Sequence, residues 1–117
     1  MAEHLKTGSA GEDLAVKYLL ERGYTVLARN FRFKRAEIDI IASRKNILVF
    51  AEVKTRSSAQ FGFPEDFVDN KKVELFLLAA DEYIYQQQWQ HDVRFDIISI
   101  IKKGNEVQIH HIEDAFH

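Results

Sequence analysis

Two apolar segments joined by a short polar turn constrain the fold of this chain more than any other feature. The segments Glu37 to Ala42 and Ile47 to Thr55 are rich in Ile, Val and other residues typical of β-strands. Ser43 to Asn46 lies between them and has the polarity and length of a hairpin loop. We therefore expect two adjacent strands that are largely buried.

Charged side chains interrupt both of these strands. Because successive strand residues point to opposite faces, Glu37 and Asp39 share one face of the first strand. By the same count, Glu52 and Lys54 share one face of the second strand. Burial of carboxylates and an ammonium is costly unless the charges pair with one another or hold a metal. Such a conflict between burial and charge is typical of a functional site.

The composition is that of an ordinary globular protein. The 117 residues are 46% hydrophobic and 29% charged, and a net charge of −2 does not indicate a globally basic nucleic-acid binder. The chain has no cysteine, which excludes a disulfide framework and a thiolate metal site. No apolar run approaches the ~20 residues that cross a bilayer, and the N-terminus has no hydrophobic signal segment. We expect a single domain over residues 1–117, located in the cytoplasm.

Hydrophobic periodicity predicts helices and further strands around the central pair. The spacing of apolar residues indicates an amphipathic helix at Ser9 to Arg22 and a second helix from Asp69 or Asn70 to about Gln88. The other expected elements are a strand at Tyr24 to Ala28, a loop at Ser57 to Pro64, and strands at Val93 to Ile101 and Glu106 to Ile112.

Glu12 lies on or beside the apolar stripe of the first expected helix, where a carboxylate needs a reason. Ser9 to Glu12 matches a capping box, in which Glu12 bonds back to the backbone of Ser9. A place in a functional site explains the same position equally well.

A basic cluster at Arg29 to Arg35 directly precedes the first charged strand. It contains four cations and two phenylalanines, a pattern that suits contact with a phosphate backbone, although the rings fit core packing better. Two further lysines lie in the first turn of the second helix, against the preference of the helix dipole for acids, which favours an external role. The candidate nucleic-acid-binding residues are Arg29, Arg32, Lys34, Arg35, Arg56, Lys71 and Lys72.

Two carboxylates on adjacent strands can converge on one hard divalent cation. Asp39 and Glu52 supply the oxygen ligands that such a cation prefers, and the carbonyl of Val53 can supply another. Lys54 can orient the attacking water, help it to lose its proton or offset charge at the phosphorus. Glu12 can approach the same cluster from the first helix. Phosphodiester hydrolysis requires this set of groups.

The arrangement of Asp39 and Glu52-Val53-Lys54 resembles the PD-(D/E)-x-K nuclease superfamily, which has the restriction-endonuclease-like fold. More narrowly, the chain resembles the YraN-type family of small bacterial predicted nucleases, and it is similar to archaeal Holliday-junction resolvases. One departure is Ala36, where the family usually has glycine. The resemblance runs through Gly8, Gly11-Glu12, Ala15, Gly23-Tyr24, Leu27, Asn30-Phe31-Arg32, Glu37 to Ala42, Leu48 to Arg56, Lys71 and Arg94-Phe95-Asp96.

The resemblance implies an α/β fold with a central mixed sheet flanked by helices in the order αβββαββ. It implies a metal-dependent nuclease that hydrolyses DNA, branched or structured DNA included, with Glu12, Asp39, Glu52 and Lys54 as catalytic residues. The implied cofactor is Mg²⁺ or Mn²⁺, held by Asp39, Glu52 and the Val53 carbonyl, with Glu12 as a further ligand. DNA is the implied partner, and because junction enzymes of this kind are symmetric dimers, a homodimer is a further expectation.

Two other functions stay open. One is a nucleic-acid-binding module of the same fold whose cleavage activity is weak or lost, and the other is a protein-interaction domain with structural carboxylates. Retention of all the candidate catalytic groups favours the nuclease. Glu37 fits a salt bridge and a catalytic role equally well, and Asp96 is expected to be a hydrogen-bonded structural residue. The five histidines show no ligand spacing, so no zinc site is expected.

Overall fold

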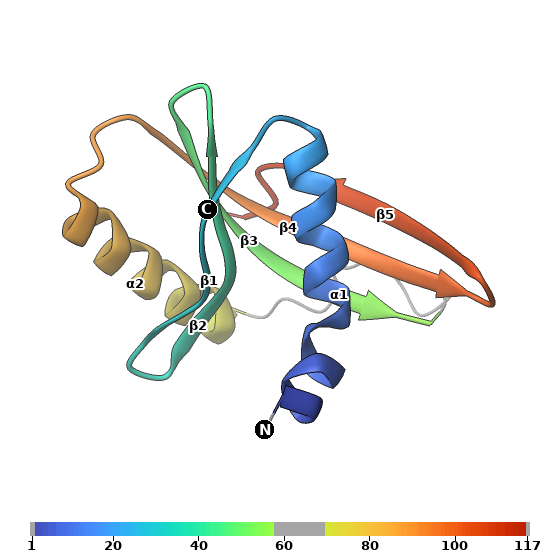
Figure 1. Ribbon diagram of the computed structural model, residues 1–117. Coiled ribbons are helices and arrows are strands. Elements are labelled where there is room, and N and C mark those ends of the chain that lie inside the picture. Colours follow the sequence, from blue (N-terminus) through green and yellow to red (C-terminus); the bar gives the residue numbers. More distant parts are fainter. Residues whose placement is uncertain (1, 58–69, 117) are drawn as a thin grey trace.

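In the part of the chain that the structure describes, five strands form one mixed sheet that carries a helix on each face (Figure 1). The computed structural model describes residues 2–57 and 70–116. The predicted order αβββαββ and the helix-flanked mixed sheet are confirmed, and the architecture is that of the restriction-endonuclease-like fold. The elements are α1 (Ala2–Glu21), β1 (Thr25–Phe33), β2 (Ala36–Arg44), β3 (Ile47–Arg56), α2 (Asn70–Gln87), β4 (Asp92–Lys103) and β5 (Glu106–Ile112).

The strands lie in the sheet in their sequence order, β1-β2-β3-β4-β5. Every neighbouring pair is antiparallel except β3 and β4, which pair in parallel from Ile47 with Asp92 to Arg56 with Ile101. A parallel pair needs a crossover connection, and α2 lies in that connection. The loop predicted at Ser57 to Pro64 falls, from residue 58 onward, outside the described residues. Neither helix in the described ranges is long and apolar enough to cross a membrane.

The sheet buries a separate apolar cluster on each face. Val49 and Ala51 of β3 pack under α1, as the alternation of side chains predicts, whereas Leu48 and Phe50 pack under α2. The α1 cluster also contains Ala15, Leu19, Tyr24, Ile40, Ala42, Ile98 and Ile100. The α2 cluster also contains Ala36, Ile38, Ile41, Phe76, Ala79, Ala80 and Tyr83.

Helix α1 begins at Ala2, not at Ser9, so the capping-box interpretation of Ser9 to Glu12 is wrong. A capping box needs a helix N-terminus at Ser9, and that residue lies inside the helix. Strand β1 is also longer than predicted and runs through the first five residues of the basic cluster. Two of these residues, Phe31 and Phe33, pack against the α2 cluster, as expected for the rings.

Strand β2 changes face at Asp39. Ile38 packs in the cluster under α2 and Ile40 in the cluster under α1, although regular alternation places residues two apart on one face. In the register of the β1–β2 hairpin, Asn30 stands opposite Asp39, and Asn30 has a left-handed backbone with φ of 55°. Asparagine adopts this conformation more readily than most residues. The outer part of the hairpin thereby turns over the α2 face and leaves Asp39 at the point of the turn.

Candidate active site

A pocket of about 320 Å³ opens where β2 and β3 separate, beside the first turns of α2. The last residue pair between the two strands joins Ile40 to Ala51. Asp39 and Glu52 are the residues immediately beyond this pair, one on each strand. Leu75 belongs to the apolar part of the pocket wall. The charged residues that line the pocket are Arg35, Glu37, Asp39, Glu52, Lys54 and Lys72. The structure therefore brings together three of the four predicted catalytic residues.

Asp39 is held by the backbone of the neighbouring strand. Its Oδ2 accepts a hydrogen bond of 2.8 Å from the N–H of Val53. Burial raises the pKa of Asp39 to about 6; the Val53 hydrogen bond opposes this, and the charges of Glu12, Glu52 and Glu37 add to it. Negative charge is thus crowded around Asp39, and a bound cation would relieve it.

Glu52 is buried, with 7% of its surface exposed, and it contacts two ammonium groups. The Nζ of Lys72 lies 2.9 Å from Oε1, and the Nζ of Lys54 lies 3.5 Å from Oε2. Burial and the nearby Lys72 ammonium lower the pKa of Lys54. The attraction of Glu52 opposes this effect but is smaller. Burial lowers the pKa of Lys72, but the side-chain contacts with Lys54 and Glu52 and the charge of Asp39 outweigh this effect and raise it.

Glu12 lies beside this group but does not line the pocket. Its Oε1 accepts hydrogen bonds from Arg29 Nη2 at 3.3 Å and from Asn30 Nδ2 at 3.2 Å. The backbone of α1 comes close to β3 at the preceding residue, because a Cβ added to Gly11 would collide with Oγ1 of Thr55. Glu12 is therefore fixed at the kink of the hairpin, from which its charge acts on Asp39.

The predicted nucleic-acid-binding cations divide into two groups. Arg29 turns to α1, where it contacts Asp13 at 2.8 Å, and Lys72 turns into the pocket. Arg56 is partly buried and donates to the carbonyl of Thr55. The second group is Arg32, Lys34, Arg35 and Lys71, and all four of these side chains are exposed. Three of these four lie on the outer part of the β1–β2 hairpin, one of them, Arg35, in the pocket wall.

Glu37 stands opposite Arg32 in the hairpin, and their side chains lie 3.6 Å apart. The Arg32 side chain is 77% exposed, so this ion pair is a weak surface contact. Because Glu37 also lines the pocket, its position fits both of the roles that its place in the sequence leaves open.

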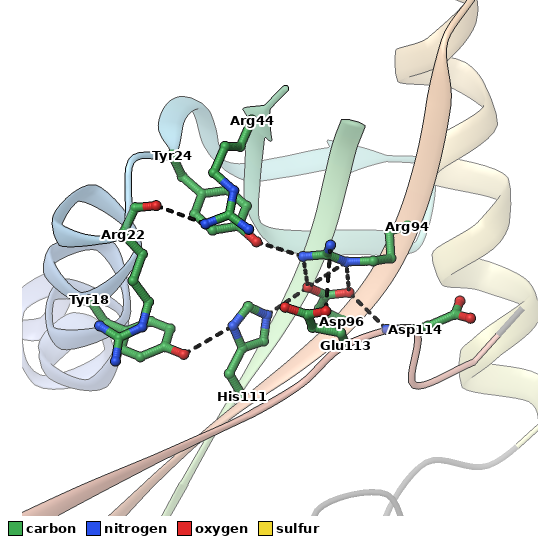
Figure 2. Close-up of polar contacts among 9 residues, drawn as sticks. All are labelled: Tyr18, Arg22, Tyr24, Arg44, Arg94, Asp96, His111, Glu113 and Asp114. Atoms are coloured by element: carbon green, nitrogen blue, oxygen red, sulfur yellow. Dashed lines mark hydrogen bonds and ion pairs between the residues drawn. The ribbon is translucent and has the colours of Figure 1, made fainter. Parts of the chain in front are cut away.

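Asp96 faces the other side of the sheet, where Figure 2 shows it between Arg94 and His111. It pairs with Ala51 of the α1 face and is fully buried. It accepts hydrogen bonds from Arg94, from the backbone N–H of Asp114 and from Nε2 of His111, the last at 2.6 Å. The expectation of a hydrogen-bonded structural aspartate agrees with this arrangement.

Two tyrosines extend the Asp96 network toward α1 (Figure 2). Arg94 donates to the hydroxyl of Tyr24 at 2.6 Å, and the hydroxyl of Tyr18 lies 3.2 Å from Nδ1 of His111. Sequence reasoning missed His111. The available signal was Asp96 itself, because a carboxylate in an apolar strand requires partners, and Arg94 two residues away shares its face.

The pocket fits a hard divalent cation better than zinc. Among the side chains described, no group of three or more histidines and acids is placed to hold a metal. Structural zinc takes four such ligands, whereas Mg²⁺ binds through one or two carboxylates and keeps several waters. Asp39 and Glu52 line one pocket and match the second pattern. A larger hollow of about 660 Å³ at the end of α2 is lined by glutamines, Ile84, Tyr85 and Trp89, and none of its described lining residues is charged.

Comparison with known proteins identifies the family. The model described as "Uncharacterised protein family UPF0102" matches residues 11–100. A UPF0102 protein of Flavobacterium psychrophilum is 50% identical over 117 residues, which cover 100% of this chain and 98% of the relative. UPF0102 proteins of Christiangramia forsetii and Bacteroides thetaiotaomicron are 48% and 46% identical, over 99% and 100% of this chain and 98% and 97% of the relatives. This chain therefore belongs to the UPF0102 family, the YraN-type family that its residues resemble.

Proposed function

We propose that this protein is a metal-dependent nuclease that hydrolyses DNA phosphodiester bonds in the pocket between the β2–β3 junction and α2. The observation that carries the proposal is the crowding of carboxylates at Asp39, whose pKa is raised to about 6 beside Glu52 and two lysines in one pocket. Buried groups with displaced pKa values that share a pocket with specific charged partners are typical of active sites. We place this activity in the cytoplasm, where the DNA of a bacterial cell lies.

Four residues of the pocket would take part in this reaction. Asp39 and Glu52 would hold Mg²⁺ or Mn²⁺, with the carbonyl of Val53 as a further oxygen ligand. When bound, the ion supplies a Lewis acid for the phosphate and lowers the pKa of the attacking water. The N–H of Val53 orients Asp39. The Lys54 ammonium offsets the negative charge that develops on the phosphate oxygens in the transition state.

The exposed cations indicate how a DNA backbone would reach the pocket. Arg32, Lys34 and Arg35 lie on the hairpin, and Lys71 lies on the first turn of α2. The pocket touches both elements, since Arg35 and Lys72 belong to its wall. A strand that passes between the hairpin and α2 would meet positive charge on both sides, and its phosphates would face Asp39 and Glu52. Branched DNA, in which strands diverge, is one substrate that suits such an opening.

The test of this proposal is cleavage of linear, supercoiled, single-stranded and four-way-junction DNA with Mg²⁺ or Mn²⁺. We expect the wild-type protein to cut at least one of these substrates and Glu52→Gln to cut it at least about 100-fold more slowly, because loss of groups that merely orient metal ligands already costs 10- to 100-fold. Addition of EDTA should stop the reaction. Cleavage that is equally fast with Glu52→Gln would come from a contaminant and would contradict the proposal.

A second candidate function is DNA binding without cleavage. The observation that favours it is the pairing of Glu52 with both Lys54 and Lys72, which balances the Glu52 charge without a metal. Binding of DNA by the intact protein in Mg²⁺ and Mn²⁺, with no product from any of the four substrates, would select this function over the nuclease.

Replacement of both Arg32 and Arg35 by alanine should weaken DNA binding and flatten its salt dependence. Each cation that contacts a phosphate contributes about one unit to the slope of log K against log salt, so the slope should fall by about two units. The measurement is fluorescence anisotropy of a labelled duplex between low and moderate salt. The matched control is Lys102→Ala with Lys103→Ala, which removes two exposed cations from the far end of β4. Equal slopes for the two double variants would reject the assigned DNA surface.

A further inference from the structure

Lys72 occupies an unusual position for a lysine. It lies in the first turn of α2, where the positive end of the helix dipole disfavours a cation. Its Nζ contacts Oε1 of Glu52 at 2.9 Å, a shorter distance than the 3.5 Å between Lys54 and Oε2. Lys71 is the preceding residue in the same turn and is also exposed. The dipole acts on both lysines, so Lys72 differs from its neighbour by its contact with the pocket carboxylate.

The Lys72 ammonium lies where a divalent cation would have to bind. Both oxygens of Glu52 contact an ammonium, and Glu52 is one of the two carboxylates proposed as metal ligands. An ammonium and a divalent cation on the same carboxylate repel each other strongly at the low effective dielectric constant of a half-buried pocket. The Lys72 side chain is 45% exposed, whereas that of Lys54 is 13% exposed. Lys72 can therefore move into solvent on its flexible stem, and Lys54 is the more confined of the two.

We propose that Lys72 is a built-in competitor of the metal ion: its ammonium neutralises Glu52 before metal binds and leaves Glu52 when the ion arrives. This inference rests on the metal site of the proposed function. In this arrangement Lys72 is a positioning residue, because it sets the charge and orientation of Glu52 without itself touching the reacting atoms. It holds Glu52 in an ion pair in the absence of metal, and it weakens the affinity of the site for divalent cations.

The experiment measures Mn²⁺ affinity in the absence of DNA, by the electron paramagnetic resonance signal of free Mn²⁺ and by isothermal titration calorimetry. We expect Lys72→Met to bind Mn²⁺ about tenfold more tightly than the wild type, because a competing unit charge is removed from the site. The matched control, Lys71→Met, should bind within about twofold of the wild type, since screening by solvent weakens the effect of an exposed charge. Lys72→Gln provides a second, polar variant, and far-UV circular dichroism verifies that each variant is folded.

Each outcome distinguishes competition by Lys72 from a metal site whose affinity does not depend on Lys72. Tighter Mn²⁺ binding by both Lys72 variants, and not by Lys71→Met, supports competition. Equal or weaker binding by the Lys72 variants overturns it, and so does the absence of binding in the wild type and the variants alike. A Lys72 effect on Mn²⁺ affinity in a protein that cuts no DNA would refute the nuclease and leave the competition in place. Cleavage by the wild type with no Lys72 effect on Mn²⁺ affinity would do the reverse.

Discussion

Asp39→Asn should abolish DNA cleavage while the protein stays as stable as the wild type or becomes more stable. The substitution keeps an oxygen that can accept the hydrogen bond from Val53 and removes a charge that lies near Glu12, Glu37 and Glu52. Burial and these neighbours raise the pKa of Asp39, so ionisation of this group favours the unfolded chain as the pH rises through about 6. Loss of a proposed metal ligand should lower the cleavage rate by at least about 100-fold.

The measurement combines the initial rate of cleavage with the melting temperature at neutral pH. The matched control is Asp81→Asn, which changes an exposed aspartate on α2 and should alter neither quantity. A structural role for Asp39 predicts a different pattern, in which the melting temperature of Asp39→Asn falls together with the rate. Full activity of Asp39→Asn would show that Asp39 is not a catalytic residue. It would also refute the proposed metal site in the pocket.

Of the substitutions proposed for this protein, Asp96→Asn should lower the free energy of unfolding the most. Asp96 is fully buried and balances Arg94, whose side chain is 15% exposed. Removal of one partner from a buried ion pair typically costs about 3–5 kcal/mol. The exposed Glu113, 3.7 Å from Arg94, would compensate only part of the lost charge. For a domain of this size the melting temperature should fall by about 10 °C or more. Thermal unfolding followed by circular dichroism measures this change.

The control for Asp96→Asn is Asp92→Asn, which alters an exposed aspartate at the start of the same strand. Equal melting temperatures for the two variants would show that the network around Asp96 contributes little to the fold. Asp96→Asn should leave the Mn²⁺ affinity of the folded protein unchanged, because Asp96 pairs with Ala51 on the α1 face of the sheet and Glu52 lies on the other face.

The same network predicts how stability depends on acid. Burial would raise the pKa of Asp96, but hydrogen bonds from His111, Arg94 and the N–H of Asp114 outweigh it and hold the pKa below the ordinary value of 3.8. The stabilisation by ionised Asp96 is therefore complete above about pH 4 and is lost as the pH falls through its lowered pKa. Urea unfolding below about pH 4 should show a shallower dependence on pH for Asp96→Asn than for the wild type.

Local patterns were sufficient to predict most of the elements. The predicted strand Glu106 to Ile112 has the bounds of β5, and the central pair agrees with β2 and β3 within two residues. Alternating apolar residues and turn residues act over a few positions of the chain, so they can be recognised without tertiary contacts. The start of α1 was missed because nothing in its first turn distinguishes it from a polar lead-in, whereas Ser9 to Glu12 imitates a helix start.

The shared pocket of Asp39, Glu52 and Lys54 could also be anticipated, because residues two apart on a strand share a face and the two strands are joined by a short turn. The change of face at Asp39 could not be anticipated from the sequence. It depends on the left-handed backbone of Asn30 in the neighbouring strand and on the apolar side chains that turn toward α2. Regular alternation would place Ile38 and Ile40 on the same face of the sheet, whereas in the structure they lie on opposite faces.

Residue patterns along the chain were enough to predict the order of the elements and the pairing of the two charged strands. They also predicted which carboxylates and which lysine these strands carry. The ion pairs, in contrast, became visible only in the folded chain: Lys72 contacts Glu52, Arg29 contacts Asp13, and Asp96 contacts His111. Strand and turn patterns arise from neighbours along the chain, whereas an ion pair forms wherever packing brings two side chains together. In this fold, the packing of α1 and α2 on opposite faces of one sheet sets those distances.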